Sequence, residues 1–170
     1  GREDGLDAGE HSAIFYKTAR FTKLDGGNFW YSETPDQPGL GWDATCCNRI
    51  CSWLKLKDNL SGKEFFFFNS HFDHQGVVAR RESSHLLLKK IKEIAGSGFV
   101  LATGDFNATP ESEPIKILLA GNLKDSRVLS KQEPQGSIGT TNGFKENPAM
   151  NNRIDYIFVV DPMRVNTYKV

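Results

Sequence analysis

The sequence has few cysteines, no net charge and no long apolar segment. Its three cysteines form one cluster, Cys46, Cys47 and Cys51, with no fourth soft ligand near them in the sequence, so we expect core packing with one reactive thiol rather than a zinc site. The 21 basic and 21 acidic residues cancel. The bulk charge therefore gives no support to nucleic-acid binding, although a bound metal can supply positive charge locally. No apolar run is long enough to span a membrane, and the first residues lack the apolar core of a signal peptide, which leaves the compartment open.

The remaining composition indicates a folded globular protein. The chain has 170 residues, 38% of them hydrophobic, with 12 Phe and 3 Trp. This is enough for a core, and we expect one domain over residues 1–170. We expect the three tryptophans to belong to the core rather than to a base-stacking surface, because they lie in or beside predicted strands.

The hydrophobic pattern changes between strand and helix periods along the chain. Strands are predicted at residues 10–16, 21–24, 28–31, 49–57, 64–71, 99–102, 153–160 and 163–168, helices at 77–95 and 109–120, and polar loops at 32–42 and 124–145. The four consecutive phenylalanines 65–68 predict a strand buried on both faces. This order of elements predicts an α/β (α+β) fold in which helices cover sheets.

The stretch Gly104-Asp105-Phe106-Asn107 follows an apolar run and therefore stands at the end of a predicted buried strand. It places a carboxylate and a carboxamide two residues apart, a pair that can hold a hard cation such as Mg²⁺ together with a phosphate oxygen. Taken alone, the same four residues are equally well explained as a β-turn with local side-chain hydrogen bonds.

Two other stretches place polar groups at or near strand ends. His71 ends the phenylalanine-rich strand, where a structural hydrogen bond is the ordinary interpretation of a histidine. Asp155 interrupts an apolar run, where an unpaired carboxylate would be costly. Because the strand ends of one sheet converge, we expect His71, Asp105, Asn107 and Asp155 to line one cleft.

Three motifs together resemble those of the endonuclease/exonuclease/phosphatase superfamily, whose fold is DNase I-like. They are Asn-Ser-His-Phe-Asp-His at 69–74, Gly-Asp-Phe-Asn-Ala-Thr-Pro at 104–110 and Asn-Arg-Ile-Asp-Tyr-Ile-Phe-Val at 152–159. The stretch 27–35 resembles sequences of a mostly uncharacterised bacterial branch of this superfamily. The resemblance implies a four-layer α/β sandwich and metal-dependent phosphoester hydrolysis by a water nucleophile, with Mg²⁺ or Mn²⁺ as the cofactor.

The resemblance also implies roles for individual residues. Asp105 would position or deprotonate the attacking water, and Asp105 and Asn107 would bind the metal. His71 would contact the scissile phosphate and be steadied by Glu10, while Asp155 would orient the family's second histidine. The expected substrate-binding residues are Arg80, Arg2 and Asn69.

The family pattern extends beyond these residues at both ends. Its N-terminal strand with a metal-binding glutamate and its C-terminal Ser-Asp-His motif have no counterpart in 1–170, and the spacing of His11 and His74 does not fit that second histidine. We therefore expect a partial domain, with impaired activity for the 170-residue chain. The competing hypothesis is a non-catalytic binding module or an inactive fragment that keeps the fold. The expected partner is a phosphoester substrate, either nucleic acid or a lipid or sugar phosphate, and we expect a monomer.

Overall fold

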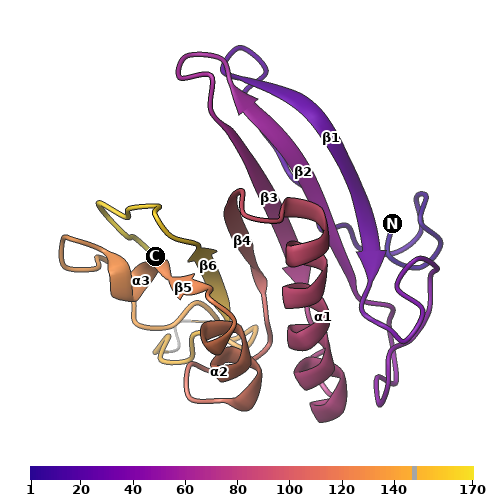
Figure 1. The fold of residues 1–170 in the computed structure, drawn as a ribbon. Helices are drawn as coiled ribbons and strands as arrows, with labels where there is room; N and C mark the ends of the chain where they lie inside the picture. Colours follow the sequence, from indigo (N-terminus) through magenta and orange to yellow (C-terminus); the bar gives the residue numbers. More distant parts are fainter. Residues whose placement is uncertain (147–148) are drawn as a thin grey trace.

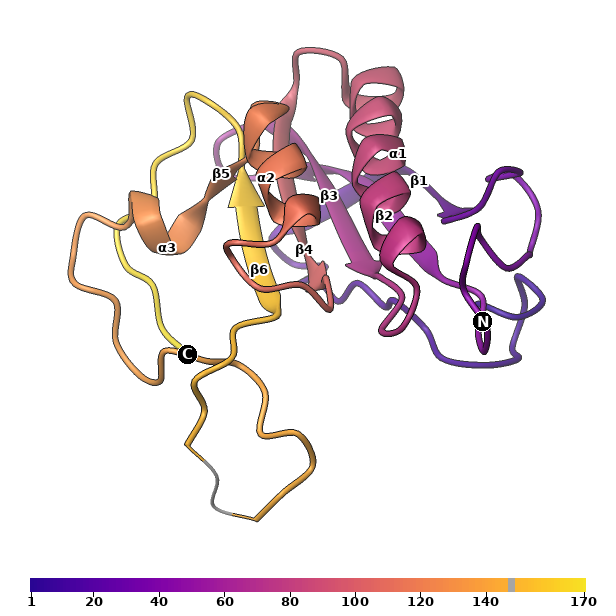
Figure 2. The same ribbon diagram turned by 90° about the horizontal axis from the view of Figure 1, so that it is seen from below.

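A computed structural model describes residues 1–146 and 149–170. Six strands form one mixed sheet in the order β1-β2-β3-β4-β6-β5. The strands are β1 (Phe21–Trp30), β2 (Ile50–Asp58), β3 (Glu64–His71), β4 (Phe99–Asp105), β5 (Lys124–Asp125) and β6 (Asp155–Val159), and the helices are α1 (Val77–Ala95), α2 (Glu113–Ala120) and α3 (Ser126–Leu129). The two long helices, α1 and α2, lie on the same face of the sheet (Figure 1, Figure 2).

Helix α1 has the bounds that the hydrophobic period predicts. Its buried positions include Leu87, Ile91 and Ala95, which are four residues apart and so form one stripe. This stripe packs in the same hydrophobic core as Phe68 of β3 and Val100 of β4. The helix therefore covers the two parallel strands β3 and β4, which end in the polar residues described below.

The N-terminus of α1 is capped from a distant part of the chain. Gly76 occupies the N-cap position and has no side chain to bond the first free N–H groups. The carboxylate of Asp43 accepts hydrogen bonds from the backbone N–H of Val78 at 3.0 Å and of Ala79 at 2.6 Å instead. The loop around Asp43 and the start of α1 are thereby held together.

The four phenylalanines of β3 are not all buried, contrary to the sequence prediction. Phe68 is inaccessible, whereas Phe65, Phe66 and Phe67 are partly exposed. Alternate residues of a strand face opposite sides, so Phe66 and Phe68 share the helix-covered side while Phe65 and Phe67 face the other. Among the described residues, no helix covers that second face.

Several predicted elements differ from the structure. Residues 10–16 form no strand, because their hydrogen bonds, such as those from Ser12 to the Ile50 carbonyl and from the Arg2 N–H to the Glu10 carbonyl, do not form a ladder with another strand. The two short strands at 21–24 and 28–31 are one strand, β1. Helix α2 begins at Glu113 rather than at Thr109, residues 124–145 contain β5 and α3, and 163–168 form no strand. Within the described part of the chain, no helix combines the length and apolarity needed to cross a bilayer.

Candidate active site

Three polar residues form one row across adjacent strands of the sheet. His71, the last residue of β3, is the register partner of Asp105 in β4, and Asp105 is in turn the partner of Asp155 in β6. Register partners on neighbouring strands point to the same face and lie about 5 Å apart. The convergence of His71, Asp105 and Asp155 predicted from the sequence is therefore found in the structure. Asn107, predicted to join them in one cleft, is not among the residues that line the cavity shared by these three.

Gly104 is required next to this row. Its φ of +148° lies in the region that favours glycine, and a Cβ at this position would run into the backbone oxygen of Ser70 on β3. The close approach of β4 to β3 just before Asp105 depends on a residue with no side chain.

A cavity of about 330 Å³ opens over the row. Its lining includes all three side chains of the row and Asn69, and the segment before β1 contributes His11 and Ser12. A larger cavity of about 820 Å³ lies between the C-terminal ends of α1 and α2, and lysine and apolar side chains dominate its walls. Volume alone does not locate the site, so the chemistry of the lining must.

His71 lies between two carboxylates. Its Nδ1 is 3.3 Å from Oε2 of Glu10, and its Nε2 is 3.8 Å from Oδ2 of Asp105. Burial lowers the pKa of His71, the charge of Arg49 lowers it further, and the charge of Glu10 raises it. The neutral imidazole is thus favoured by its surroundings, while the charges of Glu10 and, to a smaller extent, Asp155 favour the imidazolium.

The two aspartates of the row both resist ionisation. Burial raises the pKa of Asp105 against an opposing hydrogen bond from the Asn107 N–H, at 2.8 Å. Burial also raises the pKa of Asp155, and the nearby charge of Asp105 raises it further. The Thr140 hydroxyl lowers this pKa by donating a hydrogen bond to the carboxylate at 2.6 Å. Two carboxylates on register partners of neighbouring strands are an arrangement that a bound cation would stabilise.

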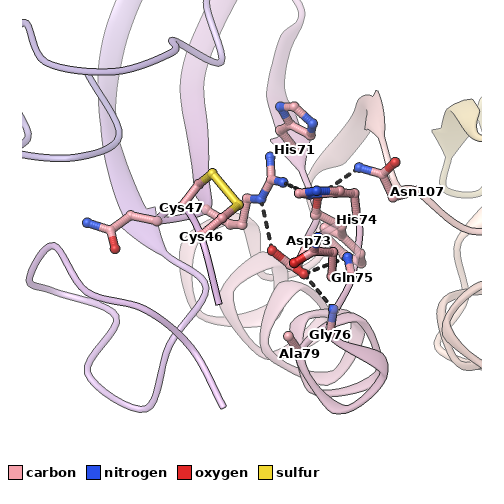
Figure 3. Close-up of polar contacts among 12 residues, drawn as sticks. Cys46, Cys47, His71, Asp73, His74, Gln75, Gly76, Ala79 and Asn107 are labelled. Carbon is pink, nitrogen blue, oxygen red and sulfur yellow. Dashed lines mark hydrogen bonds and ion pairs between the residues drawn. A yellow bond between two sulfur atoms is a disulfide. The ribbon is translucent and has the colours of Figure 1, made fainter. Parts of the chain in front are cut away.

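Asn107 is held in the turn that follows Asp105. Its φ of +46° is one that asparagine tolerates better than most residues. Its side-chain nitrogen donates to the carbonyl of Phe72 at 3.0 Å, and Figure 3 shows this contact. The amide oxygen, which is the atom that can bind a metal or accept from a ligand, is left without a protein donor among the described residues.

A buried arginine lies next to the site. Nε of Arg49 is 3.3 Å from Asp73, and its Nη2 is 2.6 Å from Nδ1 of His74. Asp73 is itself fixed by the backbone N–H groups of Gln75 and Gly76. Figure 3 shows this network beside His71, and the Arg49 charge also lowers the pKa of Asp105. Arg49 therefore adds positive potential under the row.

A second group of possible metal ligands lies in the same network. Cys46, Asp73 and His74 each bring one donor atom to within 4.8 Å of the others. However, the Cys46 sulfur is bonded to Cys47 in a disulfide, and the other two side chains are already bonded to Arg49. This trio does not have free ligand atoms for an ion.

The remaining predicted residues occupy different places. Asn69 lines the cavity and is held by Thr103 at 2.9 Å. Arg2 pairs with Glu10 through a side-chain hydrogen bond and lies at the rim of a neighbouring cavity. Arg80 donates to the carbonyl of Asp73 at 3.1 Å and is not part of the cavity lining.

Two further residues at the site were not predicted from the sequence: Thr140, which contacts Asp155, and His11, which lines the cavity. Thr140 lies 15 residues before Asp155 in a polar loop, and its hydroxyl contacts both the carboxylate and the backbone of Asp155. No pattern marks such a residue, because the contact depends on how the loop folds back.

The prediction of a reactive thiol was wrong. The free cysteine, Cys51, is buried, and burial raises the pKa of its thiol to about 12.

The fold places the chain in a class of proteins that a family model and solved structures identify. The model of the endonuclease/exonuclease/phosphatase family matches residues 11–170. The chain belongs to the endonuclease/exonuclease/phosphatase family, and the predicted DNase I-like fold is confirmed.

Similar proteins come from bacteria and a virus. The structure of a mannosyl-6-phosphatase from Bacteroides thetaiotaomicron is 42% identical, with a TM-score of 0.93, over 100% of this chain and 64% of that one. A second endonuclease/exonuclease/phosphatase family protein of that species is 44% identical, with a TM-score of 0.93, over 100% of this chain and 62% of the other. An uncharacterised protein of Acanthamoeba polyphaga mimivirus is 36% identical over 81 residues, which are 46% of this chain and 30% of that protein. The chain thus spans less than two thirds of the length of these relatives.

Proposed function

We propose that this protein is a metal-dependent phosphoester hydrolase that uses a water nucleophile. The observation that carries the proposal is the row His71, Asp105 and Asp155, which opens on one cavity. A non-catalytic binding module has no chemical need for an imidazole in one row with two carboxyls, Asp105 and Asp155, whose pKa values burial raises.

The donor set fits Mg²⁺ or Mn²⁺. Asp105 and Asn107 present oxygen atoms, the ligands that hard divalent cations prefer, and these cations leave further positions to water and phosphate. We propose that Asp105 and Asn107 hold the ion. When bound, the ion supplies positive charge for the phosphate oxygens and lowers the pKa of a coordinated water.

The chain's own groups account for the remaining chemistry. Asp105 orients the attacking water, and its carboxylate oxygen that does not hold the ion takes the water's proton. As the new phosphorus–oxygen bond forms, the bond to the leaving oxygen breaks, and that oxygen takes a proton from solvent water. His71 donates from Nε2 to a phosphate oxygen when the phosphate dianion favours the imidazolium, and Glu10 orients the ring through Nδ1.

The favoured substrate class is a sugar phosphate. One relative with a TM-score of 0.93 is a mannosyl-6-phosphatase, and the zero net charge of the chain does not match the basic surface expected of a protein that binds nucleic acid. We therefore propose a phosphomonoester of a sugar as the substrate and treat nucleic acid as the alternative.

The test is hydrolysis by the purified protein and its Asp105→Ala variant. Mannose 6-phosphate, p-nitrophenyl phosphate and a single-stranded oligonucleotide are offered with Mg²⁺, and circular dichroism confirms that each variant is folded. We expect release of phosphate from the monoesters to fall by roughly 100-fold or more in Asp105→Ala. Asp7→Ala, on an exposed loop, serves as the matched control. Equal turnover by Asp105→Ala and the control, with the fold kept, would show that Asp105 takes no part in hydrolysis and would overturn the proposed mechanism. No turnover by the folded, unaltered protein would favour the binding module and overturn the proposal.

A further inference from the structure

A second cavity lies at the same edge of the sheet as the candidate active site. It has a volume of about 460 Å³, and its lining includes Thr109, Arg127, Asn152 and Arg153. Thr109 follows Asp105 by four residues, and Arg153 precedes Asp155 by two. Two residues of extended chain span at most about 7 Å. The walls of this second cavity are therefore continuous with the segments that carry the row.

Arg153 is a buried arginine whose hydrogen-bonding capacity is only partly used. The residue is 7% exposed. Its Nη2 is 2.5 Å from Oδ2 of Asp125, and its guanidinium lies 4.4 Å from the centre of the Tyr156 ring. Its Nη1 is buried without a hydrogen-bond partner among the described residues. A buried donor left unpaired costs free energy, so such an atom needs an explanation.

Arg127, the other arginine in the lining of the cavity, repeats this feature. Its guanidinium lies 5.6 Å from the centre of the Tyr168 ring, and its Nη1 is likewise buried with no partner in the described part of the chain. The other oxygen of Asp125 is already occupied, since it accepts the backbone N–H of Arg127 at 2.9 Å. No carboxylate of the described residues lies within ion-pair distance of the Arg127 side chain.

Two arginines, Arg127 and Arg153, and one carboxylate, Glu111, line the cavity, and Asp125 contacts the arginines. Asp125 is the carboxylate that directly contacts these side chains, and Arg153 neutralises it. Glu111 also lines the cavity, but it is exposed to solvent and forms no ion pair with either arginine. Guanidinium groups with free N–H atoms are the usual protein ligands of phosphate, sulfate and carboxylate groups.

We propose that the cavity of Arg127 and Arg153 binds an oxyanion, and that this oxyanion is a second anionic group of the substrate. The cavity volume falls within the range of small-molecule sites. The first half of the proposal, an oxyanion site, stands on the arginine geometry alone. The second half rests on the proposed function, because it places the scissile phosphate over the row and the second anion against Arg127 and Arg153.

The oxyanion site is tested by binding, without any turnover. Inorganic sulfate is titrated into ¹⁵N-labelled protein, and the side-chain Nε–Hε signals of the arginines are followed by NMR. We expect saturable shifts at Arg127 and Arg153, which Arg127→Gln abolishes and Arg81→Gln, a variant on the exposed side of α1, leaves unchanged. Arg153→Lys keeps the buried charge opposite Asp125 and is expected to weaken the shift at Arg127. Shifts that increase linearly with sulfate concentration, without saturating, overturn the proposed oxyanion site. Shifts that are equal in Arg127→Gln and Arg81→Gln overturn it as well.

The assignment of the oxyanion to the substrate is tested by kinetics. A hexose monophosphate and the corresponding hexose bisphosphate are compared as substrates of the protein and of Arg127→Gln. We expect the KM of the bisphosphate to rise by about tenfold with kcat kept, and the KM of the monophosphate to stay within about twofold. An equal effect on both substrates overturns the assignment and identifies the ligand as a free anion. If neither substrate is hydrolysed, the proposed function fails while the sulfate titration still decides the site.

Discussion

Asp105 and Asp155 face each other across the β4–β6 ladder as register partners. Both carboxyls have a raised pKa, chiefly because of burial, and the negative charge of Asp105 raises the pKa of Asp155 further. The pair therefore opposes folding when both groups are ionised, and a bound cation would relieve this opposition. The relationship makes the stability of the protein depend on pH and on divalent ions.

Replacement of Asp155 by Asn should stabilise the metal-free protein at neutral pH. A carboxyl whose pKa is higher in the folded state contributes stability below its unfolded pKa and loses it as the pH rises through the folded pKa. Asp155→Asn removes that loss and keeps an oxygen that accepts from Thr140. We expect a gain of up to about 1 kcal/mol at pH 7, limited by solvent screening, and no gain near pH 3. Urea unfolding at both pH values measures it, with Asp7→Asn as the control; a gain that is the same at both would contradict the explanation.

Replacement of Glu10 by Gln should make His71 harder to protonate. Glu10 lies 3.3 Å from Nδ1 of His71, and its charge raises the pKa of that imidazole. In Glu10→Gln the charge is gone but a hydrogen-bond acceptor remains, so the pKa of His71 should fall. The Cε1–H resonance of His71, followed by NMR across pH 4–9, gives the value directly. Glu3→Gln, which alters a contact of Arg2 and none of His71, should leave the titration unchanged; an identical effect of both variants would argue against a specific pairing.

Replacement of Gly104 by Ala should destabilise the protein strongly. The backbone conformation at Gly104 disfavours a side chain, and the added methyl group meets the Ser70 carbonyl of the neighbouring strand. Strain and overpacking together should cost about 2–4 kcal/mol in the free energy of unfolding. Gly39→Ala is the control, since nothing lies closer than 4.0 Å to its Cβ. Equal unfolding midpoints in urea for the two variants would show that β3 and β4 can separate at this point without cost.

Replacement of Asp43 by Ala should loosen the start of α1. Desolvation raises the pKa of Asp43, but hydrogen bonds from the N–H groups of Ala79 and Val78 outweigh it and hold the pKa below its ordinary value of 3.8. The stabilisation is therefore present above that value and is lost as the pH falls through the folded pKa. In Asp43→Ala, the amide protons of Val78 and Ala79 should exchange faster at pH 7, as hydrogen–deuterium exchange would show. Asp36→Ala provides the comparison, and unchanged exchange in Asp43→Ala would mean that water caps the helix equally well.

The sequence alone determined the elements whose residues interact with near neighbours. Helix α1 was predicted with its observed bounds because Leu87 and Ile91 repeat with the helical period and their burial follows from that period. β3 and β4 were likewise predicted from apolar runs that end in polar residues. Residues 10–16 were predicted wrongly as a strand. Their polar and apolar residues alternate as in a strand, but no partner strand pairs with them, and the alternation alone does not show whether a partner exists.

The tertiary structure decided the register and the contacts between distant segments. That polar groups gather at strand ends was visible in the sequence, but the pairing of His71 with Asp105 and of Asp105 with Asp155 needed the sheet order β3-β4-β6. The hydrogen bond from Thr140 to Asp155 and the unpaired nitrogens of Arg127 and Arg153 likewise depend on loops that fold back over 15 residues or more. Local periodicity is set by the geometry of a few adjacent residues, whereas these contacts are set by how whole elements pack, which no single stretch of the chain encodes.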